Sequence, residues 1–143
     1  PFRNEKENLI LSALLMDHFK NHGITEDSFS FAEQKQRMDA IDTYIDENIT
    51  RAVSCEELAR FSGVHVNYLS QFLKRNRGRS TVAYIRKKRM AYAREQLIQS
   101  GNKVVTVAEH MGFPDQFTFS KMYKKEYGLS PVEDMKKRGT TYT

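Results

Sequence analysis

The feature that most constrains the fold of this chain is a short pattern that occurs twice, once on each side of a long helical stretch. Ala59 and Gly63 recur as Ala108 and Gly112, 49 residues later. Further pairs recur at an offset of 50 residues: Leu69 and Ser70 as Phe119 and Ser120, and Gly78 and Ser80 as Gly128 and Ser130. The pattern predicts one small structural unit in two copies, with one extra residue in the second.

Each copy carries the signals of two helices joined by a tight turn. In the first copy, Ser54–Glu57 is a capping box, which predicts a helix that ends at Gly63. A second helix follows over Val64–Arg77 and stops at Gly78. We therefore expect a helix-turn-helix unit over residues 54–78.

In the second copy the capping-box pattern recurs at Thr106–Glu109, and we expect a helix-turn-helix unit over residues 106–128. A third capping box, Ser130–Glu133, has Pro131 at its first helical position and predicts a last helix to about Arg138. Helical spacing predicts that five side chains of the two units are core: Phe72, Leu73, Phe119, Met122 and Tyr123.

The stretch between the copies predicts one helix over Ser80–Ser100, with Ser80 as its N-cap and Gly101 as its stop. Four apolar side chains fall on one stripe of this helix, and two arginines share it: Val82, Met90, Ala93 and Leu97, with Arg86 and Arg89. The arginines have two interpretations, as phosphate contacts or as partly buried partners of acidic residues. For Arg89 we favour the structural role.

A further amphipathic helix is predicted over Asn4–His22, and Gly23–Phe31 has no lasting period and is typical of a linker. The helical pattern resumes from about Phe31. Because no stretch alternates with a period of two, the fold class is all-α, with about eight helices. Two helix-turn-helix units are joined by the long central helix, and an amphipathic helix precedes them.

Charge divides the chain unevenly. Residues 1–50 carry five Lys and Arg against ten Asp and Glu, whereas residues 51–143 carry 18 against eight. The basic part suits a polyanion, and a solvated surface without a partner is the alternative. A helix of about 20 residues is about 30 Å long, close to the roughly 34 Å between successive turns of the DNA major groove. Because a similar unit is predicted on each side of this helix, its length favours DNA as the polyanion.

Other chemistry has little support in the sequence. The single Cys55 excludes an intrachain disulfide, and we expect a structural role for it rather than a nucleophilic one. His18 and His22 could share a metal, but no Cys or further His is near them, and we expect neither metal nor cofactor. Without a signal peptide or membrane span, we expect the cytoplasm. The sequence begins at Pro1, and we expect it to be part of a longer protein.

The residues of the second copy resemble the DNA-binding domain of the AraC/XylS family of bacterial transcription regulators. The resemblance covers about residues 36–138, and its most specific part is VAEHMGFPDQFTFSKMYKKEYGLSP at residues 107–131. The central YIRKKRMAYAREQL also resembles the linker of that family. His65 departs from the small polar cap usual in the family, and Pro114 from a common Ser or Glu.

The resemblance implies that the second helix of each unit enters the major groove of double-stranded DNA. It implies base contacts by eight residues: Val66, Asn67, Ser70, Gln71, Gln116, Phe117, Thr118 and Lys121. Seven further residues suit phosphate contacts: Lys74, Arg75, Arg77, Arg79, Ser120, Lys124 and Lys125. Asn and Gln can pair with adenine, Lys favours guanine, and Phe or Thr can meet a thymine methyl group.

The resemblance further implies a sequence-specific transcription regulator without enzymatic activity, with activation favoured and RNA polymerase as a possible partner. Residues 36–143 would be the DNA-binding domain, and residues 1–35 the remnant of a regulatory or dimerisation domain and linker. A small-molecule effector would bind in the missing N-terminal domain, and the Asn4–His22 helix would form a homodimer. We expect a cytoplasmic, nucleoid-associated protein. The alternative is an architectural DNA-binding or protein-interaction module that does not read sequence.

Overall fold

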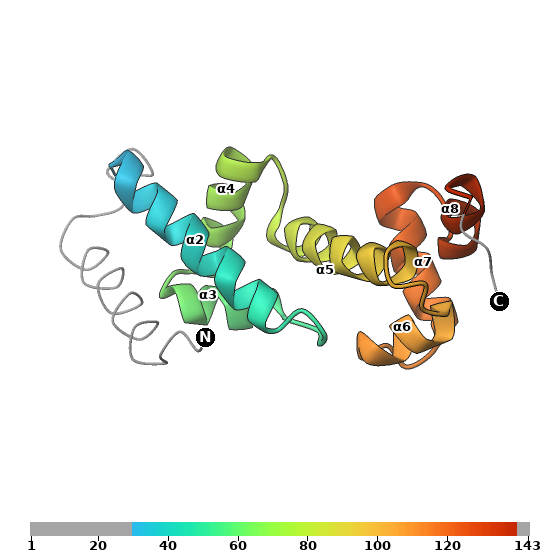
Figure 1. The fold of residues 1–143 in the computed structure, drawn as a ribbon. Helices are drawn as coiled ribbons and strands as arrows, with labels where there is room; N and C mark the ends of the chain where they lie inside the picture. The colour runs from blue at the N-terminus through green and yellow to red at the C-terminus, as the bar shows by residue number, and fades with distance from the viewer. Residues whose placement is uncertain (1–29, 140–143) are drawn as a thin grey trace. The chain divides into compact units, whose positions relative to one another are not determined.

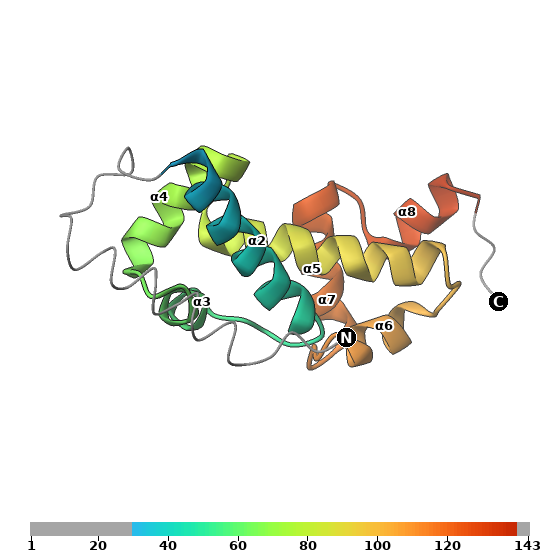
Figure 2. The same ribbon diagram turned by 60° about the vertical axis from the view of Figure 1, so that its left-hand side comes forward.

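The computed structural model describes residues 30–139, and within them the chain forms helices and no strand. The all-α prediction is therefore confirmed. Seven helices follow one another in this part of the chain: α2 Phe31–Glu47, α3 Cys55–Ser62, α4 Val66–Arg77, α5 Thr81–Ile98, α6 Val104–His110, α7 Gln116–Tyr127 and α8 Pro131–Lys137 (Figures 1 and 2). The predicted helix Asn4–His22 lies outside the described residues.

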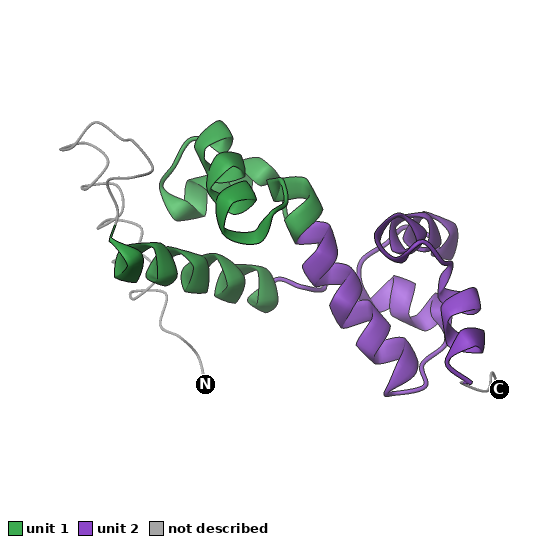
Figure 3. Cartoon of the chain, turned by 90° about the horizontal axis from the view of Figure 1, so that it is seen from above, with its two compact units in different colours: residues 1–47, 53–84 green, residues 48–52, 85–143 purple. Residues whose placement is uncertain are grey.

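The described chain divides into two compact units, shown in green and purple in Figure 3. Unit 1 comprises residues 30–47 and 53–84 of the described part, and unit 2 comprises residues 48–52 and 85–139. Each unit contains one helix-turn-helix pair, α3 with α4 and α6 with α7, so the repeat in the sequence is a repeat in the structure.

Unit 1 is built on the apolar stripe of α2, which packs beside α3. Met38, Ile41 and Ile45 are buried on α2, and Leu58, Leu69 and Leu73 are buried on the helix pair. Arg37 is also buried, with its guanidinium 5.3 Å from the ring centroids of both Tyr68 and Phe72 on α4. Sequence reasoning missed Arg37, because an arginine on an amphipathic helix is normally solvated.

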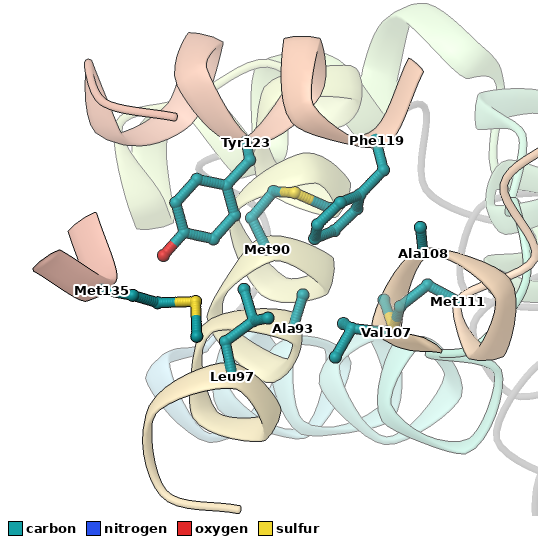
Figure 4. Close-up of a cluster of buried hydrophobic side chains, with 9 residues drawn as sticks. All are labelled: Met90, Ala93, Leu97, Val107, Ala108, Met111, Phe119, Tyr123 and Met135. Atoms are coloured by element: carbon teal, nitrogen blue, oxygen red, sulfur yellow. The ribbon is translucent and has the colours of Figure 1, made fainter. Parts of the chain in front are cut away.

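Unit 2 encloses its own core between the second part of α5 and helices α6, α7 and α8. In Figure 4, Phe119 and Tyr123 project from α7 toward Met90 of α5, and Met135 of α8 closes the end of the cluster. Met122 is only partly buried and packs against this cluster. The predicted core of both helix pairs is thus present, with Met122 at its edge.

Most predicted helix ends are confirmed. Ser54 accepts a hydrogen bond from the backbone NH of Glu57 at 3.0 Å, and Gly63 ends α3 with a φ of 68°. Ser130 and Glu133 form the complete capping box at the start of α8. His65, the departure noted above, is itself the N-cap of α4, because its ring Nδ1 accepts from the backbone NH of Asn67.

The capping box predicted at Thr106–Glu109 is wrong. Helix α6 begins three residues earlier, with Lys103 at the N-cap and no side-chain cap, so Thr106 lies inside the helix. The 49-residue offset of the repeat agrees with this start, because it aligns Lys103 with Ser54, the N-cap of α3. A Ser or Thr three residues before Glu also occurs inside helices, and the pattern alone does not separate the two cases.

The apolar stripe predicted on α5 is wrong at Val82, whose side chain is 60% exposed. The other members, Met90, Ala93 and Leu97, are fully buried in unit 2. The first turn of α5 belongs to unit 1 and buries Thr81 and Tyr84 instead. One stripe cannot describe this helix, because it contributes to two different cores.

Candidate nucleic-acid interface

Helix α4 has one buried and one exposed face. Leu69, Phe72 and Leu73 are buried in unit 1. At about 100° per residue, Asn67, Gln71 and Lys74 fall within about 60° of one another on the opposite side, and all three are exposed. The exposed face of α4 therefore presents an amide, a second amide and an ammonium group in sequence order.

Helix α7 repeats this arrangement 50 residues later. Phe119 and Tyr123 are buried, and Phe117, Lys121 and Lys124 occupy the centre of the exposed face. The two helices therefore expose matched positions with different chemistry. Asn67 corresponds to Phe117, Gln71 to Lys121, and Lys74 to Lys124.

The remaining residues predicted to contact bases or phosphates border these centres. Gln116 and Thr118 are exposed on either side of Phe117, whereas Val66, Ser70 and Ser120 are half-buried. None of the predicted contact residues of α4 and α7 is buried, and Arg79, which follows α4, is half-buried.

Cations gather at the C-terminal end of each of these helices. Lys74, Arg75 and Arg77 lie in the last turn of α4, and Lys124 and Lys125 in the last turn of α7. Arg77 is 3.8 Å from the Asp42 carboxylate, which also accepts a hydrogen bond from the Tyr84 hydroxyl. Arg77 is therefore less available to a phosphate than Lys74.

The start of α7 is capped by an acid. The Asp115 carboxylate accepts a hydrogen bond from the backbone NH of Thr118 at 2.7 Å. This bond holds the pKa of the Asp115 carboxyl below its usual value, so the group is ionised at neutral pH. Negative charge at this end of α7 would repel a phosphate group, whereas the cations at the other end would attract one.

A buried carboxylate fixes the orientation of α7 in unit 2. Asp134 of α8 accepts from the Tyr123 hydroxyl at 2.5 Å and from Arg94 of α5 through two hydrogen bonds, 2.9 and 3.1 Å long. Arg138 adds a further hydrogen bond of 3.2 Å. Because Tyr123 stands on the buried side of α7, this network ties the helix to α5 and α8.

The two arginines of the predicted α5 stripe, Arg86 and Arg89, both have structural partners in unit 2. Arg86 forms an ion pair with Glu126 at 3.1 Å, which agrees with the second of its two interpretations, a partly buried partner of an acidic residue. Arg89 is buried, and it donates to the backbone carbonyls of Ile49 at 3.2 Å and Met111 at 2.5 Å. The structural role of Arg89 is confirmed, but the predicted acidic partner is wrong, because these carbonyls take its place.

Net charge differs between the units. By sequence, residues 48–52 and 85–143 contain 13 Lys and Arg against six Asp and Glu, a net charge of +7. Residues 1–47 and 53–84 contain ten against 12, a net charge of −2. Unit 2 therefore carries most of the positive charge that would attract a polyanion.

Other candidate chemistry gains no support. Cys55 lies in the first turn of α3, where burial, and next the Glu56 carboxylate, raise the pKa of its thiol, the opposite of what a nucleophile requires. No group of three potential metal ligands occurs within residues 30–139, and His18 and His22 lie outside them. No helix of the described part is long and apolar enough to span a membrane.

Comparisons with known proteins agree with this geometry. A family model described as a helix-turn-helix domain matches residues 58–137. The transcriptional activator RhaS of Mannheimia succiniciproducens is 25% identical over 127 residues, which cover 89% of this chain and 47% of RhaS. The chain thus spans about half the length of this curated relative.

Solved structures are similar over the same region. The C-terminal domain of AraT, a response regulator from Geobacillus stearothermophilus, is 29% identical with a TM-score of 0.62, over 75% of this chain and 87% of that one. The DNA-binding domain of AdpA, solved in complex with a target DNA, is 16% identical with a TM-score of 0.62, over 73% of this chain and 98% of that one. The likeness to AdpA shows a shared fold.

Proposed function

Because the chain belongs to the AraC-type family of helix-turn-helix transcription regulators, we propose that it binds a specific double-stranded DNA sequence and thereby regulates transcription. One observation carries the proposal: α4 and α7 each bury one face in their own unit and expose matched positions on the other. The major groove admits an α-helix, and varied side chains on the exposed face of that helix can distinguish one base pair from another.

Eight side chains on these faces are proposed to meet base edges: Val66, Asn67, Ser70, Gln71, Gln116, Phe117, Thr118 and Lys121. The amides of Asn67 and Gln71 suit adenine, and the Lys121 ammonium suits guanine. Seven others are proposed to contact phosphates: Lys74, Arg75, Arg77, Arg79, Ser120, Lys124 and Lys125. These contacts set affinity and register rather than sequence preference.

Selection of bound duplexes from a random pool tests the proposal and yields the site. Replacing Gln71 or Gln116 with Ala should then weaken binding to that site by about 1–3 kcal/mol and relax preference at one or two positions. Lys124→Ala is the matched control, because losing a phosphate contact weakens all sequences alike. If Gln116→Ala lowers specific and random binding equally, Gln116 is not in the groove.

The alternative is an architectural or protein-interaction module that uses charge alone, and the net charge of +7 in unit 2 is the observation that favours it. Such a module would bind all duplexes with one affinity and one strong salt dependence. Measuring selected and scrambled duplexes across salt concentrations separates the two functions, because only a sequence reader keeps a preference at every salt concentration.

The role in the whole protein is proposed by analogy. RhaS is a transcriptional activator, and we propose activation here, with RNA polymerase as the partner and a small-molecule effector bound outside this chain. Residues 36–143 would form the DNA-binding domain, and residues 1–35 the end of a regulatory domain and its linker. Such a protein would act in the cytoplasm, at the nucleoid.

A homodimer through the Asn4–His22 helix is part of the same proposal. Its sequence places Leu11, Leu14, Leu15 and Phe19 on one face, which is a large apolar area to leave in water. Light scattering on the chain and on a shortened chain that begins at Gln34 tests this interface. A dimer for the first and a monomer for the second is expected, whereas the same oligomeric state for both would exclude it.

A further inference from the structure

Phe117 is a large apolar side chain in the middle of an otherwise polar surface. It is the second residue of α7, and its side chain is 71% exposed. Its helix neighbours on the exposed side, Lys121 and Lys124, are exposed cations, and Gln116 and Thr118 beside it are exposed as well. The ring takes no part in the core cluster of unit 2, to which α7 contributes Phe119 and Tyr123.

An exposed phenyl ring in the major groove can discriminate bases through an apolar contact. It has no hydrogen-bond donor or acceptor, so it cannot read the polar pattern of a base edge. In the major groove, the apolar group that distinguishes one base from the others is the C5 methyl group of thymine. The Thr118 side chain, exposed one position further along, adds a second methyl group to the same end of α7.

The matched position in unit 1 has the opposite chemistry. Asn67 occupies the place on α4 that Phe117 occupies on α7, and its amide both donates and accepts. Two units that differ here would prefer different base pairs at corresponding positions of their half-sites. The difference between Asn67 and Phe117 would therefore make the two half-sites different in sequence, so that the DNA site is asymmetric.

We propose that Phe117 reads the C5 methyl group of a thymine in the half-site bound by unit 2, and that this contact distinguishes that half-site from the one bound by unit 1. The inference rests on the proposed function, because it requires α7 to enter a major groove. In this proposal the exposed Phe117 ring contacts DNA and not a protein partner. Its consequence is that a single methyl group on the DNA changes affinity.

Deoxyuridine substitution tests the proposal, since it removes the methyl group and leaves base pairing intact. In the duplex selected by the full chain, each thymine is replaced in turn by deoxyuridine and the Kd is measured. At one position in one half-site we expect about fourfold weaker binding, which corresponds to about 0.8 kcal/mol for one methyl-sized group. Restoring a methyl group there with 5-methylcytosine opposite guanine should bind more tightly than unmethylated cytosine.

A double-mutant cycle assigns the effect to the residue. Phe117→Ala should bind the thymine duplex more weakly and bind the thymine and deoxyuridine duplexes equally at that position. Asn67→Ala is the matched control and should keep the discrimination. Because Phe117 is exposed, its replacement should leave the melting temperature within about a degree of the parent, which separates a lost contact from a lost fold.

The outcomes are distinct. If the chain selects a site but no thymine in it is sensitive to deoxyuridine, or if Phe117→Ala keeps the full discrimination, the proposal is wrong and sequence-specific binding stands. If no site is selected at all, the proposed function fails and this inference fails with it. Loss of discrimination in both Phe117→Ala and Asn67→Ala would also overturn it, because the effect would then not belong to α7.

Discussion

At the scale of single residues, Asp134 shows how a buried charge can be retained in so small a unit. Its carboxylate is 1% exposed and accepts hydrogen bonds from Tyr123, Arg94 and Arg138. Burial alone would raise the pKa of this carboxyl, but the three donors outweigh it, so the pKa lies below its ordinary value. The ionised form is therefore the form that the fold stabilises.

This pKa predicts how stability depends on pH. Because the folded pKa lies below the unfolded value of about 3.9, the stabilisation is complete above about pH 5 and is lost as pH falls through the folded pKa. Asp134→Asn should lower the free energy of unfolding by about 3 kcal/mol at pH 7, because it leaves arginines without their acid. The difference from the parent should narrow below about pH 4.

Urea unfolding followed by circular dichroism at pH 7 and pH 3 measures both effects. Glu109→Gln is the control, because Glu109 is an exposed carboxylate of the same unit and should be nearly neutral at both pH values. A constant difference between Asp134→Asn and the parent at all pH values would show that the ionised carboxylate is not the source of the stability.

Arg89 is the second residue whose charge is used inside unit 2. Its side chain is 5% exposed, and its guanidinium lies 5.0 Å from the ring centroid of Phe113 while it donates to two carbonyls. Arg89→Ala should lower the free energy of unfolding by about 2 kcal/mol or more, because the carbonyls lose their donor and a cavity opens. Arg89→Lys should recover only part, since an ammonium group cannot reproduce the planar donor geometry.

The same variants separate structure from DNA contact. The slope of binding affinity against salt concentration should be unchanged in Arg89→Ala, because a buried guanidinium neutralises no phosphate. Lys87→Ala, at an exposed position of α5, is the control for stability and should leave it nearly unchanged. An unaltered unfolding midpoint together with a shallower salt slope for Arg89→Ala would assign Arg89 to the phosphates after all.

At the scale of the helices, the two capping-box patterns of unit 2 make a matched pair. Ser130 caps α8 and accepts from the backbone NH of Glu133 at 3.2 Å, whereas Thr106 lies inside α6. Ser130→Ala should lower the free energy of unfolding by about 1 kcal/mol. Thr106→Ala should be neutral or slightly stabilising, because Ala is the better residue inside a helix. Equal losses in urea unfolding would contradict the assigned start of α6.

The helices also show what sequence reasoning can and cannot reach. Glycines at Gly63, Gly78 and Gly128 were sufficient to place three helix ends, because each adopts a left-handed conformation that other residues avoid. The start of α6 was missed, because Lys103 carries no cap signal. Val82 was misassigned, because periodicity assumes that a helix faces one core, whereas α5 serves two.

The candidate site also contains features that the sequence predicted and features that it did not predict. The family resemblance placed Asn67, Gln71, Lys121 and Lys124 on the exposed faces, periodicity predicted the buried residues opposite them, and the structure exposes all four. What periodicity could not supply were the contacts that orient these faces, such as Arg37 between Tyr68 and Phe72 or the donors around Asp134. These depend on residues brought together by the fold from distant positions, and no local pattern encodes them.

At the scale of the whole molecule, α5 is the covalent connection that matters for DNA recognition. It is one helix of 18 residues, Thr81–Ile98, and its sequence contains neither Gly nor Pro. At about 1.5 Å per residue it extends about 27 Å. Helices bend sharply at Pro, at Gly or where the backbone hydrogen bonds are interrupted, so the sequence of α5 predicts one uninterrupted helix that the two units share.

We propose that this shared helix sets the spacing of the two half-sites on the DNA. Because the two units follow each other head to tail in one chain, a single chain should prefer an asymmetric site of about 17–20 base pairs, with both half-sites on one face of the duplex. Inserting about five base pairs between the half-sites turns the second onto the opposite face, and binding should fall toward the affinity of one half-site alone. The comparison requires Kd values for the selected site, for the five-base-pair insertion and for a duplex with one half-site scrambled.

A mutant with Gly residues at Lys87 and Lys88, both within α5, should tolerate the insertion better than the parent, because a more flexible helix can reach around the duplex. If the parent binds the insertion as tightly as the selected site, α5 does not fix the spacing, and each unit finds its half-site independently.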